Sequence, residues 1–237
     1  MSDSLLLDAI RNNAEWCDAF VRASGGAAEF RESWWWNGAR SPELYPNLIT
    51  LSRLDRTQQL DAIQQLLERG LGTDWGVKDS FAALDLKPLG FRLLFDAQWF
   101  GIATAPLSEE DEEDDIDWFF VEDEETFDEW QDAWGEESDF FPPALLEDPN
   151  IAFAFARTDE TISAGAIFNR DAGVCGFSNF FVAADEQAQF FPSALAKARA
   201  WSGGLTVVGY TSEAALDELA FEALERLGPL RIWLFGQ

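Results

Sequence analysis

The sequence predicts an α/β (α+β) protein built on a mixed, mostly antiparallel central sheet flanked by helices. Two apolar runs, 164–169 and 173–179, are separated by a polar break at 170–172 that suits a hairpin turn. Residues 205–211 form a short continuous apolar run, which is typical of a fully buried strand. A helical pattern over 212–227 and a closing strand at 230–235 follow, so helices alternate with strands and are expected to cover the sheet.

The rest of the chain supplies further elements of the same kinds. Apolar residues at helical spacing predict helices over 4–22, 55–69 and 124–134. Aromatic and β-branched runs predict strands over 45–51, 91–102 and 118–121. In the last third, Ser212 stands at an N-cap position, and Gly228 with Pro229 is expected to stop the helix that Ser212 begins.

Three consecutive Trp residues occupy positions 34–36. Adjacent side chains of a strand point to opposite faces, so at least one of the three is expected to be exposed or to line a cavity. Two interpretations stay open: an aromatic cluster of core and edge, or a surface that stacks on a ligand. Under the second interpretation, Trp35 is the candidate substrate contact.

The length of 237 residues allows one large domain or two small lobes, and 21 Phe and 11 Trp can fill a large core. Some of so many aromatic residues are expected to be exposed, and a second copy of the chain in a homodimer could cover them. No stretch approaches the roughly 20 apolar residues of a membrane span, and the first residues do not resemble a signal peptide. We therefore expect a cytoplasmic protein that does not bind a membrane.

The net charge of −28 argues against nucleic acid and anionic lipid as partners, since both attract basic surfaces. The acidic residues are concentrated: 109–148 contains 20 Asp and Glu and no Lys or Arg. The stretch could be a solvated face, a docking surface for a basic partner or a mimic of nucleic acid. Its carboxylates lack the spacing and the glycine of a calcium loop, so no metal is expected.

The chain has no histidine, which excludes Ser-His-Asp and Cys-His catalysis and histidine-containing zinc sites. The two cysteines, Cys17 and Cys175, lie far apart in apolar surroundings and do not form a CxxC pair. We expect both to be reduced packing residues.

A short internal repeat predicts two lobes. Residues 80–85 and 212–217 share five of six amino acids, and each is preceded by a strand candidate and followed by an aromatic strand ending in Phe-Gly. A duplication and a chance match both stay open. The corresponding division is a lobe over 1–105, an acidic linker over 106–115 and a second lobe over 116–237.

The order of elements after residue 151 resembles the second half of the GNAT acyltransferase superfamily. The most specific segments are 208–210, Leu216 and 227–233, which look like the last strand, helix and strand of bacterial GNAT-like proteins. The resemblance implies an acetyl-CoA-dependent N-acetyltransferase that acts on an amine, either a small molecule or a peptide, or on another basic substrate.

The resemblance also implies where each group binds. Acyl-CoA would lie between the two central strands, and a tyrosine near the second of them would protonate the leaving thiolate. The implied residues are Tyr210 for catalysis, Phe180, Phe181, Val182 and Gln187 for the cofactor, and Ser178 and Asn179, together with Trp35, for the substrate.

The sequence departs from the GNAT pattern at the loop that holds the pyrophosphate. Such loops use glycines and the N-terminus of a helix to approach phosphate, but 183–190 contains no glycine and carries Asp185 and Glu186. The equivalent stretch of the first lobe, 53–57, also lacks glycine but has two arginines. A catalytically silent GNAT-like module that binds a ligand or a protein is therefore the alternative.

Overall fold

The computed structural model describes residues 2–102, 116–135, 140–158, 160–183, 187–219 and 223–236. The chain forms two compact units. Unit 1 consists of Met1–Trp99, Thr211–Glu213 and Arg226–Gln237, and unit 2 consists of Phe100–Tyr210 and Ala214–Glu225. None of the helices among the described residues is long and apolar enough to cross a membrane.

Unit 1 has strands in the order β1-β2-β3-β4-β11-β5, with β3 and β4 parallel and with β1–β2, β2–β3 and β4–β11 antiparallel. Its elements are α1 (Ser2–Ala23), β1 (Ala28–Phe30), β2 (Trp34–Asn37), β3 (Pro46–Thr50), α2 (Arg56–Glu68), β4 (Gly76–Asp79), the short 3₁₀ helix η1 (Lys87–Leu89), and most of β5 (Phe91–Ile102) and β11 (Leu224–Phe235).

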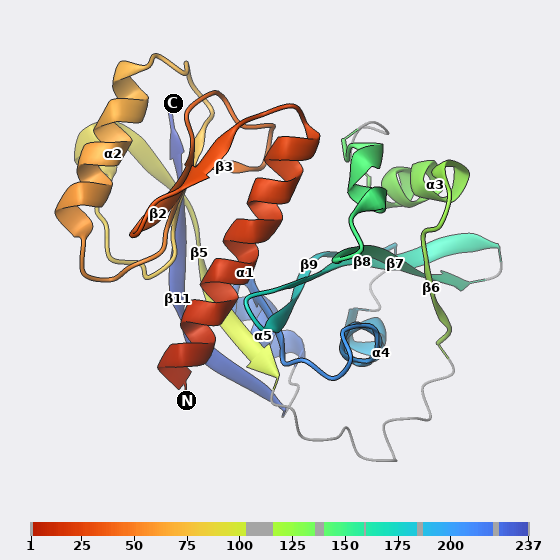
Figure 1. Cartoon of the computed structure of the whole chain (residues 1–237). Helices are drawn as coiled ribbons and strands as arrows, with labels where there is room; N and C mark the ends of the chain where they lie inside the picture. Colours follow the sequence, from red (N-terminus) through yellow and green to blue (C-terminus); the bar gives the residue numbers. More distant parts are fainter. Residues whose placement is uncertain are drawn as a thin grey trace. The chain divides into compact units, whose positions relative to one another are not determined.

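The helices α1 and α2 cover opposite faces of the unit 1 strands (Figure 1). Trp35 of β2 is fully buried and donates from Nε1 to Oδ1 of Asp18 in α1, at 2.8 Å. Its neighbour Trp36 belongs instead to the core cluster that contains Ile63 and Leu66 of α2. The alternation of a strand therefore divides the Trp run between two helices.

Unit 2 has strands in the order β10-β9-β8-β7-β6, with β9 and β10 parallel and the other neighbours antiparallel. Its elements are β6 (Trp118–Phe120), α3 (Glu124–Trp134), the 3₁₀ helix η3 (Pro143–Glu147), β7 (Ile151–Thr158), β8 (Thr161–Asp171), β9 (Val174–Val182), α4 (Gln187–Trp201), β10 (Val207–Thr211, through Tyr210) and α5 (Glu213–Leu219, from Ala214). Phe100 and Ile102 of β5 complete its core.

The helices α3 and α4 also lie on opposite faces of their sheet (Figure 1). Phe191 of α4 packs with Phe177 of β9, with ring centroids 5.6 Å apart. On the other face, Trp130 of α3 packs edge-on against Phe153 and Phe181. Both faces of β9 are therefore covered by aromatic side chains.

The predicted fold class is confirmed, and the predicted helices over 4–22, 55–69 and 124–134 correspond to α1, α2 and α3. The predicted hairpin turn is also present: Ala172 and Gly173, with φ of 51° and 75°, join β8 to β9. Positive φ at both central residues is what a two-residue hairpin requires.

The prediction of one helix over 212–227 is wrong, because α5 ends at Leu219 and β11 already begins at Leu224. Gly228 and Pro229 lie inside β11 and do not stop a helix. A Cβ at Gly228 would lie 3.2 Å from Cδ2 of Leu6 in α1, so this glycine allows close packing of β11 on a helix. Tertiary packing overrides the local helical pattern here.

The two matching hexapeptides have different structures. Residues 80–85 form a turn after β4, whereas Ser212 directly precedes α5. At a larger scale the units do share an order: antiparallel strands, a helix, and a strand parallel to the last of them, seen in β1-β2-β3-α2-β4 and in β7-β8-β9-α4-β10. The predicted linker lies outside the described residues, so the division at 106–115 stays a prediction.

The described part of the acidic stretch includes an exposed helix face. The acids of α3 that point to solvent are Glu124, Glu125, Asp128, Glu129 and Asp132. Asp123 caps this helix by accepting from the backbone N–H of Thr126, and this bond lowers the pKa of the Asp123 carboxyl. Exposed acids along α3 are expected both of a solvated face and of a docking surface for a basic partner, so both interpretations stay open; 109–115 and 136–139 lie outside the described residues.

Candidate functional site

The parallel strands β9 and β10 pair over only two residue pairs, Val207 with Cys175 and Val208 with Gly176. Both strands continue beyond these pairs, β9 to Val182 and β10 to Thr211. No further pairing between them occurs within 177–182 and 209–211, all of which are described. Backbone groups on this side of β9 are therefore available to another molecule.

A bulge in β9 lies beside the point where the strands part. Asn179 has φ of 52°, and the register with β8 shifts between the pairs Ile167–Ser178 and Gly165–Phe181. Such a bulge inserts a residue and reverses the alternation of the side chains that follow. Accordingly Phe180 packs on the α4 face with Phe191, with ring centroids 5.5 Å apart.

Ser178 and Tyr210 lie on the same face of the sheet, the face that α3 covers. Each is two residues beyond the last paired residues, Gly176 and Val208, and side chains two apart share a face. The hydroxyl of Ser178 is buried and has no hydrogen-bond partner among the described residues. Tyr210 is half-buried at the end of β10. Two hydroxyl groups therefore border the parted strands.

Gly209 makes the last close contact before the strands part. A Cβ at this position would lie 2.7 Å from the carbonyl oxygen of Phe177 and 2.7 Å from Cζ of Phe100. Only glycine allows this approach. Gly209 lies in the apolar run at 205–211 that predicts a buried strand, but this pattern does not indicate that the glycine borders a site.

The remaining predicted cofactor residues occupy three kinds of position. Phe180 and Phe181 contribute their rings to the cores on opposite faces of β9, and Val182 pairs with Ala164 of β8. Gln187 is the first residue of α4, and its side chain lies outside the described part. These residues share one strand and the helix that follows it.

The predicted substrate residues are not all brought together. Ser178 and Asn179 lie at the bulge of β9, but Trp35 lies in unit 1 and is fully buried against α1. Residues 184–186, where the resemblance locates the pyrophosphate, are outside the described part of the chain.

The corresponding place in unit 1, between β3 and α2, is filled by the protein's own side chains. The carboxylate of Asp55 accepts hydrogen bonds from the hydroxyls of Ser33 and Ser52, which lowers the pKa of Asp55. The amide of Gln59 donates to the carbonyl oxygens of both serines, at 3.0 and 2.8 Å. Arg53, one of the two arginines considered for phosphate, lies over the ring of Phe81.

Neither cysteine is suited to nucleophilic chemistry. Burial raises the pKa of the Cys175 thiol to about 12 and also raises the pKa of Cys17. Both are free and buried, which confirms that they are reduced packing residues. Within the described ranges, no three carboxylate or thiol side chains lie close enough to hold one metal ion.

No protein-family model matches the sequence, and no curated protein matches it. Solved structures do resemble it. A conserved protein of unknown function from Staphylococcus epidermidis ATCC 12228 gives a TM-score of 0.62 at 13% identity, covering 89% of this chain and 94% of its own. A GCN5-related N-acetyltransferase from Kribbella flavida gives 0.57 at 12% identity, with coverage of 94% and 95%.

A third structure, an acetyltransferase of the GNAT family from Colwellia psychrerythraea, gives a TM-score of 0.53 at 12% identity and covers 97% of this chain and 96% of its own. At such low identity these similarities show the fold alone. The chain has a GNAT-like fold, as the resemblance in sequence implied.

Proposed function

We propose that this GNAT-like chain is an acetyl-CoA-dependent N-acetyltransferase that acts on an amine, and that its site is the open end of β9 and β10 in unit 2. The observation that carries the proposal is the parting of these parallel strands beside the bulge at Asn179. A strand that pairs on one side only offers its N–H and C=O groups to an extended ligand with amide groups of its own.

The described residues fit the part of acyl-CoA nearest the thioester, which is a narrow chain containing two amide bonds. The unpaired backbone of β9 can bind those amides, and the hydroxyl of Ser178 supplies one further polar group. When bound, the cofactor would supply an acyl group on a thioester, which an amine can attack once it has lost its extra proton to solvent. The C–N bond would form as the C–S bond breaks, and the remaining amine proton would pass to solvent. The two strands hold the cofactor's arm in line and exclude water from it.

Tyr210 is suited to holding the proton that the leaving thiolate takes up. Its hydroxyl shares a face with Ser178, and each residue is two positions beyond the last strand pair. A phenol hydroxyl can donate its proton to a thiolate as that group leaves. The predominance of acidic residues in the chain favours a cationic amine as substrate by raising its local concentration.

The test is acetyl transfer from acetyl-CoA to a panel of amines, followed by the release of CoA thiol. Tyr210→Phe is expected to lower kcat by about 100-fold with little change in KM for acetyl-CoA, because only proton transfer is lost. The chain offers a matched control, Tyr45→Phe, since Tyr45 is the second of its two tyrosines and stacks on Phe20 in unit 1. Equal kcat values for the two variants would contradict the role of Tyr210.

A second function, a GNAT-like module that binds a ligand or a protein without catalysis, is favoured by one feature of the sequence. Residues 183–190 contain no glycine and carry Asp185 and Glu186 ahead of α4, where phosphate groups would be repelled. No binding of acetyl-CoA by the full chain, together with no acetyl transfer to any amine, would support this function over the first.

A further inference from the structure

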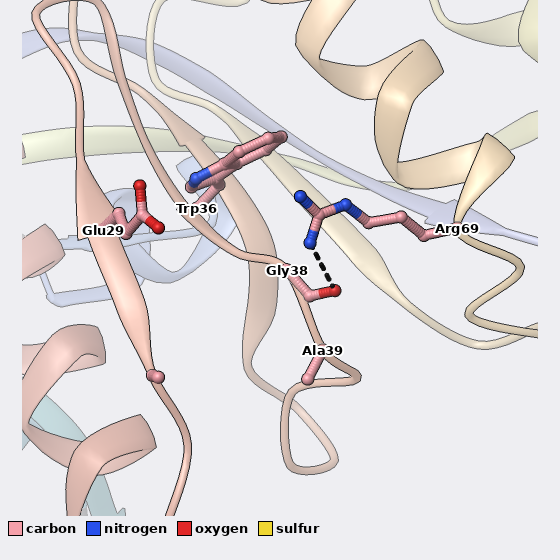
Figure 2. A pocket seen from close by; sticks show the side chains of 6 residues that line it. Glu29, Trp36, Gly38, Ala39 and Arg69 are labelled. Carbon is pink, nitrogen blue, oxygen red and sulfur yellow. Dashed lines mark hydrogen bonds between the residues drawn. The ribbon is translucent and has the colours of Figure 1, made fainter.

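Unit 1 contains a small open cavity that plays no part in the proposed acetyl transfer. Its volume is about 280 Å³, and it is lined by Ala27, Glu29, Trp36, Gly38, Ala39 and Arg69. Figure 2 shows Glu29 and Arg69 on opposite sides of the Trp36 indole. Across the cavity, the carboxylate of Glu29, the indole of Trp36 and the guanidinium of Arg69 thus lie in that order.

Arg69 is held in place by three features at the end of α2. Its guanidinium lies 4.9 Å from the centroid of the Trp36 ring, and Nη1 donates to the carbonyl oxygen of Gly38 at 3.2 Å (Figure 2). A Cβ at Gly38 would lie 3.1 Å from Cζ of Arg69, so glycine at this position allows the approach. This bond uses one of the five N–H groups of the guanidinium, so others can bind a ligand in the cavity that Arg69 lines.

Glu29 is fixed beside the same indole by the register of the sheet. It pairs directly with Trp36 across β1 and β2, so the two side chains are neighbours on one face. Its carboxylate forms an ion pair with Arg31, which directly follows β1. A carboxylate has two oxygens and can accept from a second cation at the same time.

We propose that this cavity binds a small zwitterion, with the carboxylate of the ligand on Arg69 and its ammonium group on Glu29. A guanidinium binds a carboxylate through two parallel hydrogen bonds, and an indole face attracts an ammonium group. A ligand with a single negative charge is repelled by a chain of net charge −28, whereas a zwitterion has no net charge. The volume limits the ligand to an amino acid or a molecule of similar size.

A series of ω-amino acids tests the proposal, from glycine and β-alanine to 4-aminobutyrate and 6-aminohexanoate. Binding to the full chain is measured by calorimetry and by ligand-observed NMR. At least one member is expected to bind about tenfold more tightly than butyrate and butylamine, which carry only one of the two charges. Equal binding of the singly charged compounds, or no binding of any zwitterion at about 10 mM, would overturn the proposal.

Variants assign the binding to the cavity. Arg69→Gln and Glu29→Gln are each expected to weaken binding of the best zwitterion by about tenfold or more. Gly38→Ala is expected to weaken binding as well, because the new methyl group would displace the guanidinium of Arg69 without removing its charge. The matched control is Arg31→Gln, which removes the ion-pair partner of Glu29 and should leave binding equal or stronger. Undiminished binding in both Arg69→Gln and Glu29→Gln would place the ligand elsewhere and refute the site.

Discussion

The two units contain the same local arrangement, a pair of parallel strands joined by a helix, but differ in how the polar groups at its open end are used. In unit 1, the backbone N–H of Ser80 after β4 donates to Oγ1 of Thr50 in β3 at 2.8 Å, so the strands stay linked at their ends. In unit 2, β9 and β10 part after the pair Gly176–Val208, and the hydroxyl of Ser178 has no partner among the described residues.

The contrast shows that a shared topology does not make two equivalent sites. At the start of α2, Asp55 and Gln59 bind the hydroxyl and carbonyl groups of Ser33 and Ser52, so these groups are already used within unit 1. In unit 2 the buried hydroxyl of Ser178, beside the parted strands, has no hydrogen-bond partner among the described residues, a cost in stability that proteins commonly accept at functional sites.

The largest difference is expected between Gly209, inside β10, and Gly76, the first residue of β4. Gly209→Ala should destabilise the protein by about 1–3 kcal/mol or more, because the new methyl group would meet the backbone of Phe177 at 2.7 Å. Gly76→Ala should cost less than about 1 kcal/mol, because its methyl group would lie 3.4 Å from the nearest atom, the carbonyl oxygen of Trp233. Urea denaturation of both variants measures the difference, and equal midpoints would contradict it.

A smaller difference is expected when one hydroxyl is removed from each unit. Thr50→Val leaves the buried N–H of Ser80 without its acceptor and should cost about 1–3 kcal/mol. Ser178→Ala removes a buried hydroxyl that makes no such bond and should change stability by less than about 0.5 kcal/mol, or increase it. The ranking would be refuted if Ser178→Ala proved the more destabilising variant in urea.

The smallest effect is expected in how the free energy of unfolding changes at acidic pH. Hydrogen bonds from Ser33 and Ser52 lower the pKa of Asp55 in the folded state below its unfolded value of about 3.9. The stabilisation from this carboxylate is therefore present above about pH 4 and is lost as the pH falls through the folded pKa.

Asp55→Asn should accordingly lower the urea midpoint at pH 7 and approach the midpoint of the unmodified protein as the pH falls below about 4. Asp61→Asn removes an equal charge from an exposed position on the same helix and is the control. A constant gap between Asp55→Asn and the unmodified protein at every pH would show that the pKa of Asp55 is not lowered by folding.

The parts of the fold that follow from local spacing could be predicted from the sequence. The apolar face of α1, with Ile10, Cys17 and Phe20 buried, repeats at helical spacing, and the hairpin turn at Ala172 and Gly173 lies in a short polar break. Tyr210, Ser178 and Asn179 are candidates because the order of elements resembles a known fold, and their roles stay predictions. These features depend on residues near one another in the chain.

Features that depend on distant residues could not be predicted. The sequence pattern predicts that Gly228 ends a helix. In the structure this glycine instead allows β11 to approach Leu6, more than 200 residues away in the chain. The alternation of the Trp run indicated that at least one member would be exposed or would line a cavity, and Trp36 lines a cavity, whereas Trp35, the candidate substrate contact, is fully buried. Which face of β2 meets which helix decides that choice, and the sequence of the strand does not contain this information.

The most direct test is calorimetric titration of the full chain with acetyl-CoA, which measures the number of binding sites per chain. One site per chain is expected, because among the described strands β9 and β10 part, whereas β3 and β4 stay linked at their ends. The site should be retained in Arg53→Gln and weakened about tenfold in Ser178→Val, where a larger apolar group replaces the hydroxyl. Two sites per chain, one site that disappears in Arg53→Gln, or no binding at all would contradict a single cofactor site in unit 2.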